Sequence, residues 1–259
     1  MNTFVDAAFG LDPGRWPLPV AITPEEHWQR AVAAGGQGRY ASAMTDLDAM
    51  ARMPPGDALA SLALSTRASF LRQLGGHVAA RGWDGRAWAR AGSDVDAGTD
   101  ALIGLAADAL GVGRLSASDR LLCRAAELLG RAARGRLPVR LAWVSAELAM
   151  AGGAGADAVR HAQHAVDLAE GTGSARHAVK SQVVLAAAWC SAGELDASRR
   201  VADEALAATE RLGLIPLSWA LASLLVGIGS TVHSPAQIGA VRDGFADAVR
   251  RRGGSWTAR

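Results

Sequence analysis

A short motif that returns about every 40 residues is the feature of this sequence that most constrains its fold. Each copy is a glycine followed, five positions later, by alanine or serine. The glycines are Gly38, Gly75, Gly113, Gly153 and Gly193. The small residues are Ala43, Ala80, Ser118, Ala158 and Ser198, so the spacings are 37, 38, 40 and 40 residues. Such a fixed period predicts structural repeats that stack side by side.

Each copy of the motif predicts a pair of antiparallel helices. The glycine ends the first helix because it can adopt the left-handed backbone conformation, and the small residue lets the second helix pack closely. Thr23-Pro24-Glu25-Glu26 has the pattern of a capping box with proline at the first helical position. The expected helices span 23–34, 38–52, 57–74, 76–91, 98–111, 115–134, 138–151, 154–170, 174–192, 194–212, 216–230 and 234–252. No strand-like alternation remains outside these ranges, so an all-α fold is expected.

Two of the units resemble the tetratricopeptide repeat (TPR) superfamily. In the first unit, the matching residues are Trp28, Gly38, Tyr40, Ala43, Leu47 and Pro55. The fifth unit, residues 186–225, resembles the longer variety of roughly 40 residues found in large bacterial signalling and transcription-activator proteins. The resemblance covers about residues 23–252 and implies a right-handed α-solenoid of about six antiparallel helix pairs. Gly155 departs from the pattern, because an aromatic residue is usual there.

The two ends of the chain differ from the repeats. Residues 1–22 contain Pro13, Pro17 and Pro19 and are expected to form an irregular leader, in which Trp16 could anchor the segment to a groove or to the first pair. Residues 253–259 are expected to be a basic tail. A TPR-like repeat domain over residues 23–252 lies between these two segments.

Composition limits the compartment and the partners. Half of the residues are hydrophobic and the net charge is only +2, so the balance of charges calls for neither nucleic acid nor an anionic membrane. Cys123 and Cys190 form no disulfide framework, which favours a reducing compartment. The most apolar window, residues 217–228, is shorter than the ~20 residues that cross a bilayer. We therefore expect a soluble, cytoplasmic protein.

The search for catalytic chemistry yields one weak candidate. His161 and His164 lie one helical turn apart, with Asp157 a turn earlier on the same face. These positions are expected on an outer face and no further ligand completes a tetrahedral set, so we predict no metal and no cofactor. Neither cysteine belongs to an activating motif. We expect a protein that is not an enzyme, with an enzyme using the His161 and His164 face as a rival reading.

A basic segment raises nucleic acid as a further alternative. Its arginines are Arg120, Arg124, Arg131, Arg134, Arg136 and Arg140. They could follow a phosphate backbone. The better explanation is that these arginines complement helix C-termini and acidic helix faces. Nucleic acid is therefore not the expected partner.

The inner surface of the array is the expected binding site, because the first helix of each pair lines it. Polar residues recur there where apolar ones could have packed. The predicted peptide-binding residues are Ser65, Ser69, Arg72, Gln73, Arg140, Trp143, Glu147 and Lys180. Arginine and lysine suit carboxylates, serine and glutamine suit backbone amides, and tryptophan suits an apolar anchor. The structural alternative makes Trp143 a core residue and lets the serines bond back to their own helices.

The main functional prediction is therefore a non-catalytic scaffold or adaptor that binds a protein or peptide with acidic groups. The alternative is a regulatory or sensor module that binds a small molecule or nucleic acid. Leu224, Leu225, Val226 and Ile228 need cover and leave homo-oligomerisation open.

Overall fold

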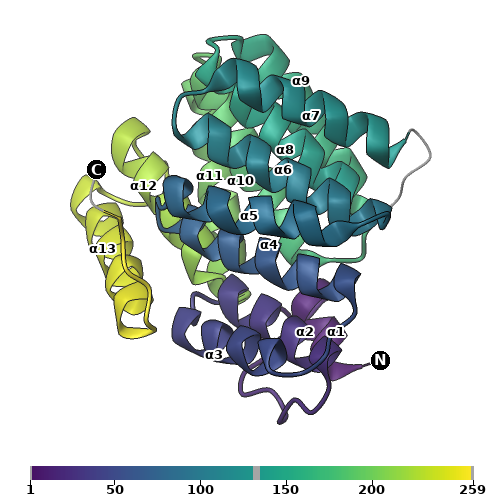
Figure 1. Cartoon of the computed structure of the whole chain (residues 1–259). Coiled ribbons are helices and arrows are strands. Elements are labelled where there is room, and N and C mark those ends of the chain that lie inside the picture. Colours follow the sequence, from purple (N-terminus) through teal and green to yellow (C-terminus); the bar gives the residue numbers. More distant parts are fainter. Residues whose placement is uncertain (1, 131–134, 258–259) are drawn as a thin grey trace.

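A computed structural model describes residues 2–130 and 135–257 of the 259-residue chain. These residues form thirteen helices and no strand, which confirms the all-α prediction (Figure 1). The helices are α1 Thr3–Phe9, α2 Pro24–Gly36, α3 Tyr40–Ala51, α4 Asp57–Gln73, α5 His77–Ala91, α6 Val95–Gly111, α7 Leu115–Leu129, α8 Arg136–Ala151, α9 Gly155–Glu170, α10 Ala175–Ser191, α11 Leu195–Arg211, α12 Ile215–Ile228 and α13 Pro235–Arg251.

Most of the expected helices have the observed bounds to within a few residues, and two differ for identifiable reasons. The helix expected at 98–111 begins at Val95, because the Asp94 side chain accepts a hydrogen bond from the Ala97 amide and caps it. The helix expected at 115–134 ends at Leu129, because Gly130 turns the backbone at a φ of 72°.

The repeat motif has the structural role that its residues predict. All five motif glycines have positive φ values, between 72° and 85°. The residue after each glycine closes the helix end with a backbone hydrogen bond to the carbonyl five residues earlier. An example is the bond from Arg39 N to Ala34 O at 2.8 Å. The five small residues that close the motifs are fully buried. Gly155 departs from the pattern because a Cβ there would lie 2.7 Å from the Ala192 Cα, which leaves no space for an aromatic ring.

The helices form a continuous array in which each packs against the next along the chain (Figure 1). The even-numbered helices α2, α4, α6, α8, α10 and α12 also contact one another in that order, and we call them the inner helices. The odd-numbered helices from α3 onward each pack against the inner helices that flank them in sequence. The inner helices therefore share one surface, as a stack of repeated pairs requires.

The two ends of the array meet. The Ala41 amide of α3 donates to the Arg252 carbonyl at 3.0 Å, and the Thr257 amide donates to the Leu74 carbonyl at 2.9 Å. Trp256 stacks on Trp219 of α12 with the ring centroids 4.3 Å apart. We call residues 252–257 the C-terminal clasp. Residues 253–259 are predicted from the sequence to be a separate basic tail, whereas residues 253–257 are docked on the first repeats.

The leader is also part of the folded body. It contains the helix α1, which the expectation of an irregular leader did not include. Phe4, Leu18 and Ala21 bury their side chains against Ala33 of α2. The side-chain Nε2 of the buried Gln37 donates to the Pro13 carbonyl at 2.9 Å and to the Arg15 carbonyl at 3.1 Å. In the described part of the chain, no helix has the length and apolar character needed to cross a membrane.

Candidate functional site

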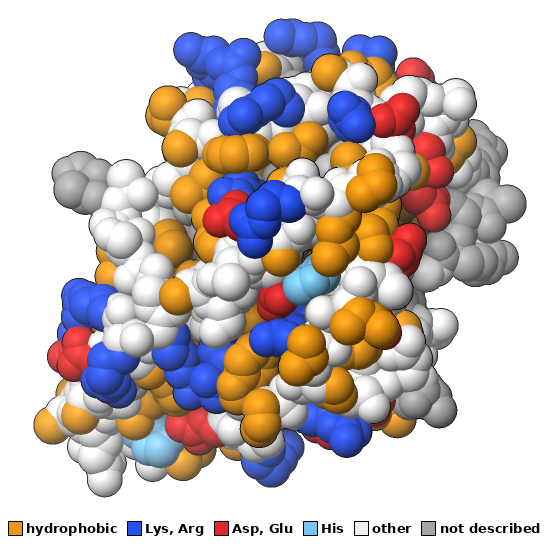
Figure 2. Space-filling model, turned by 60° about the horizontal axis from the view of Figure 1, so that its bottom comes forward, with side chains coloured by type: hydrophobic (Ala, Val, Ile, Leu, Met, Phe, Trp, Pro, Cys, Tyr) orange, Lys and Arg blue, Asp and Glu red, His pale blue; other side chains and the backbone are white. Residues whose placement is uncertain are grey.

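A cavity of about 490 Å³ lies between the inner helices. Its lining comes from α2, α4, α6, α8, α10 and α12, with Phe9 of α1 and His77 of α5 at its margins. Figure 2 shows a hollow on one face of the molecule, where acidic, basic and histidine side chains gather between hydrophobic ones. The two ends of the array meet, and the cavity between the inner helices stays partly open to solvent.

The structure brings all eight predicted site residues to this one cavity. They are Ser65, Ser69, Arg72, Gln73, Arg140, Trp143, Glu147 and Lys180. Residues from three separate repeats converge because the first helix of each pair lines the inner surface, as predicted. Their side chains nevertheless have partners within the protein, which changes what several of them can do.

Trp143 is partly a core residue, as the structural alternative proposed. Its indole is 8% exposed, and its Nε1 donates to Ser181 Oγ at 2.9 Å. One face of the indole stacks on His177, with the ring centroids 5.4 Å apart, and the Lys180 Nζ lies 5.2 Å from its centroid. Trp143 therefore contributes a fixed apolar wall to the cavity.

The polar stripe of α4 is also mostly satisfied within the protein. Ser69 Oγ donates to the Thr66 carbonyl at 2.9 Å, which is a bond back to its own helix. Gln73 accepts a hydrogen bond from the Tyr40 hydroxyl at 2.9 Å. Ser65 is 3% exposed, and its Oγ has no partner among the described residues.

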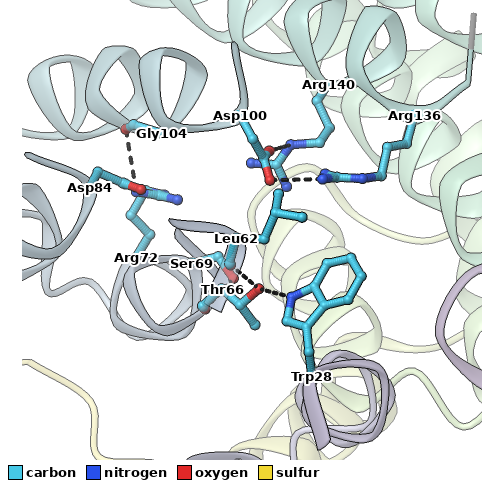
Figure 3. A network of polar contacts seen from close by, with 10 residues as sticks. All are labelled: Trp28, Leu62, Thr66, Ser69, Arg72, Asp84, Asp100, Gly104, Arg136 and Arg140. Atoms are coloured by element: carbon cyan, nitrogen blue, oxygen red, sulfur yellow. Dashed lines mark hydrogen bonds and ion pairs between the residues drawn. The ribbon is translucent and has the colours of Figure 1, made fainter. Parts of the chain in front are cut away.

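Arg72 is held between two carboxylates. Its Nη1 forms an ion pair with Asp84 of α5 and a hydrogen bond to the Gly104 carbonyl at 3.3 Å (Figure 3). It also forms a second ion pair, with Asp108 of α6, at 2.9 Å. Both carboxylates are fully buried. Arg72 was expected to receive a ligand carboxylate, but these partners give it a structural role instead.

The two carboxylates make the stability of the protein depend on pH. Burial, together with the negative charge of Asp108, raises the pKa of Asp84 to about 7 although Arg72 opposes the shift. A carboxyl whose folded pKa exceeds its unfolded value of about 3.9 stabilises the fold when protonated, and this contribution is lost as the pH rises through the folded pKa. We therefore expect a larger free energy of unfolding at pH 5.5 than at pH 8. Urea denaturation of the wild type and of Asp84→Asn at both pH values isolates this group, and equal pH dependence in the two proteins would contradict the assignment.

A second set of charges lies around Asp100 of α6. Arg136 Nη2 lies 2.9 Å from Asp100 Oδ2, and Arg140 Nε lies 3.0 Å from Asp100 Oδ1 (Figure 3). Burial alone would raise the pKa of Asp100, but the two arginines outweigh it and hold the pKa at about 2. Asp100 is therefore ionised at neutral pH.

Arg176 of α10 adds a third guanidinium to this region. Its Nη1 donates to the Val32 carbonyl of α2 at 3.1 Å, and no described carboxylate lies within ion-pair distance of it. Burial, followed by the positive charges of Arg140 and Arg136, lowers the pKa of Arg176 to about 10. We call Arg136, Arg140 and Arg176 the arginine cluster.

Burial and neighbouring charges also lower the pKa values of the remaining basic groups of the cavity, Lys180 and His177. Burial is the main cause that lowers the pKa of Lys180, and Glu147 opposes it. His177 is 4% exposed, and its Nδ1 lies 2.8 Å from Ser174 Oγ. Burial and the charge of Arg176 place the pKa of His177 well below its usual value, so this imidazole is neutral at pH 7.

The two rival sites of the sequence analysis lie elsewhere. His161 and His164 are on α9, away from the cavity lining, and Asp157 is exposed and paired with Arg160 at 2.8 Å. Within the described residues, no group of three His, Cys, Asp or Glu side chains is placed to hold a metal ion.

The basic segment does not form one surface. Arg120 and Arg124 are exposed on α7, where Arg124 lies over the Trp88 ring, whereas Arg136 and Arg140 face the cavity. Positions 131 and 134 lie outside the described residues. In the described part of the chain, these arginines therefore form no continuous phosphate-binding surface.

The sequence analysis missed several residues of the cavity. Arg176 lies one helical turn before the predicted Lys180, so the helical period alone could have identified it. Asp100 lies in a helix whose start was placed three residues too late. Phe9 gives no signal in the sequence, because it reaches the cavity from the leader.

Comparison with known proteins adds no family assignment. No protein-family model matches the chain. A search of curated proteins also finds no match. The function is therefore argued from the cavity itself, because a helical-repeat fold alone does not specify one.

Proposed function

We propose that this protein is a non-catalytic binding module that holds a compact organic ligand in the cavity between its inner helices. The observation that carries the proposal is that the inner helices surround a cavity lined by all eight predicted site residues. Its volume of about 490 Å³ falls in the range of roughly 300–1,000 Å³ that is typical of small-molecule sites. The apolar walls and the few converging polar groups also fit such a site.

The compact shape of the cavity favours a small molecule over an extended polypeptide. An adaptor of the kind first expected would lay a peptide along a groove between separate ends of the array, whereas here the two ends are joined by the clasp. Of the two functional readings of the sequence, the sensor or regulatory module that binds a small molecule therefore has the better support. The non-catalytic assignment is supported by the structural roles of Arg72 and Ser181, whose side chains bond to neighbouring helices.

The proposal also covers the type of helical repeat, the cellular location and the oligomeric state. We infer a right-handed, TPR-like solenoid of antiparallel pairs, of the roughly 40-residue bacterial variety, because the motif glycines and small residues have the roles that this family gives them. A cytoplasmic location rests on the cysteine content. Homo-oligomerisation has little support from α12, since Leu225 is fully buried and Leu224 packs on the core, which leaves Val226 as the most exposed of the group.

A cavity-filling substitution tests the binding site. Ala187 of α10 lines the cavity, so the indole of Ala187→Trp would occupy the space that a ligand needs. We expect the wild type to bind the neutral fluorescent probe N-phenyl-1-naphthylamine at one site per chain, and Ala187→Trp to bind it at least about tenfold more weakly. The measurement is a fluorescence titration.

The matched control is Ala126→Trp, which adds the same indole to an exposed position on α7. This variant should bind the probe as the wild type does. Equal binding by the wild type and Ala187→Trp would place the probe elsewhere and contradict the proposed function.

A further inference from the structure

The cavity has an uneven distribution of charge. Two carboxylates, Asp100 and Glu147, line it together with five cationic side chains. Arg72, one of the five, is already neutralised by Asp84 and Asp108. At the arginine cluster, Asp100 pairs with Arg136 and Arg140, and no described carboxylate pairs with Arg176. The cluster therefore carries an excess of positive charge inside the folded body.

The hydrogen-bonding capacity of the cluster is incompletely used. Arg176 donates from Nη1 to one backbone carbonyl, and Arg140 Nε, although 3.0 Å from Asp100, lacks the alignment of a hydrogen bond. Arginine carries five N–H donors in a planar fork that matches the oxygens of carboxylate and phosphate groups. Partly buried guanidinium groups of like charge repel one another, so an anion placed among them would gain both charge pairing and hydrogen bonds.

An aromatic surface adjoins the cluster. The guanidinium carbons of Arg136 and Arg176 lie 6.0 Å and 5.9 Å from the centroid of the Phe9 ring. Phe9 in turn packs against Trp28, with the ring centroids 5.4 Å apart. In Figure 3, Arg136 and Arg140 converge on Asp100, and Trp28 lies on the side of Arg136. An anionic group at the arginines would therefore have aromatic side chains beside it.

We propose that the arginine cluster is an oxyanion subsite, which binds a carboxylate or phosphate group of an aromatic or otherwise apolar ligand while Phe9 and Trp28 contact its apolar part. The inference deepens the proposed function and rests on it. Arg176 is the residue with the greatest expected effect, because no described carboxylate neutralises it. Arg136 and Arg140 are partly neutralised by Asp100, and they orient the anionic group of the ligand.

Two probes with the same ring system separate the subsite from the cavity. 8-Anilinonaphthalene-1-sulfonate carries an anionic oxygen group, and N-phenyl-1-naphthylamine has the same aromatic amine without it. In fluorescence titrations of the full chain, we expect Arg176→Gln to weaken binding of the sulfonate by about tenfold or more and to leave binding of the neutral probe within about twofold. Arg136→Gln should act in the same direction, and Arg176→Lys should retain more affinity than Arg176→Gln.

The matched control is Arg200→Gln, which removes an exposed arginine from α11 and should change the binding of neither probe. Unchanged sulfonate binding in both Arg176→Gln and Arg136→Gln, with the neutral probe still bound, would overturn the subsite and leave the proposed function standing. If the wild type binds neither probe, the cavity proposal and the subsite both fail.

Competition on the wild type keeps the inference testable if Arg176→Gln does not fold. Benzoate and phenyl phosphate are presented against the bound sulfonate probe, with benzyl alcohol as the uncharged counterpart. Displacement by benzoate assigns the subsite to carboxylates, and displacement by phenyl phosphate assigns it to phosphates; either supports the proposal. Displacement by benzyl alcohol at the same concentration as the anions would overturn it.

Discussion

Replacing Arg72 with leucine is expected to lower the free energy of unfolding by about 3–5 kcal/mol, which is the usual range when one partner of a buried ion pair is removed. Arg72 lies between Asp84 and Asp108, and both carboxylates are fully buried. Without the guanidinium, the two buried carboxyls would lose their compensating charge, so each would have to take up a proton or stay charged and unpaired in the interior, which costs stability. Urea denaturation followed by circular dichroism measures the loss.

A compensated variant separates this cause from the loss of packing. Arg72→Leu combined with Asp84→Asn and Asp108→Asn removes both unpaired charges and should recover most of the lost stability. The control is Arg160→Leu, because Arg160 and Asp157 form an exposed ion pair whose loss should cost no more than about 1 kcal/mol. If Arg72→Leu were as stable as the control, the buried triad would not have the role assigned to it.

Removal of residues 253–259 should open the array and lower the free energy of unfolding by about 3 kcal/mol. Roughly 2 kcal/mol of this reflects the half-buried Trp256, which leaves Trp219 and the core around Tyr40, and about 1 kcal/mol reflects the Thr257–Leu74 hydrogen bond. Because Trp256 packs on Trp219, which lines the cavity, the truncated protein should also bind N-phenyl-1-naphthylamine more weakly. Denaturation and probe titration measure the two effects.

Trp189→Ala is the matched control for this truncation. Trp189 packs against the core cluster of α8, α9 and α10, so its removal should also lower stability, but it leaves the clasp in place. Probe binding should then persist in Trp189→Ala and fall in the truncated protein. Equal probe affinity in the truncated and full-length chains would show that the clasp does not support the cavity wall at Trp219.

The sequence was sufficient to predict the features that arise within one repeat. The motif glycines act through the backbone conformation of a single turn, and Ala43 or Ser198 acts through the contact of two helices adjacent in the chain. The polar positions of the inner helices follow from the helical period, so all eight predicted site residues reach one cavity.

Features that depend on partners distant in the chain could not be predicted in the same way. Asp84 and Asp108 reach Arg72 from positions 12 and 36 residues further along, so the sequence analysis assigned Arg72 to a ligand instead of to an ion-pair triad. The clasp joins Arg252 to Gln37 over 215 residues. The curvature that brings these residues together is the sum of small rotations at every repeat, which no single motif encodes.

A distance measurement across the clasp tests the central claim, that the two ends of the array meet. Spin labels would be attached to cysteines at the exposed positions Thr45 of α3 and Arg251 of α13, in a chain where Cys123 and Cys190 are serines. Double electron–electron resonance is expected to give one narrow, short distance in the full-length protein, and a longer and broader distribution after removal of residues 253–259. A long, broad distribution in the full-length protein would show an open array and would contradict the meeting of its two ends.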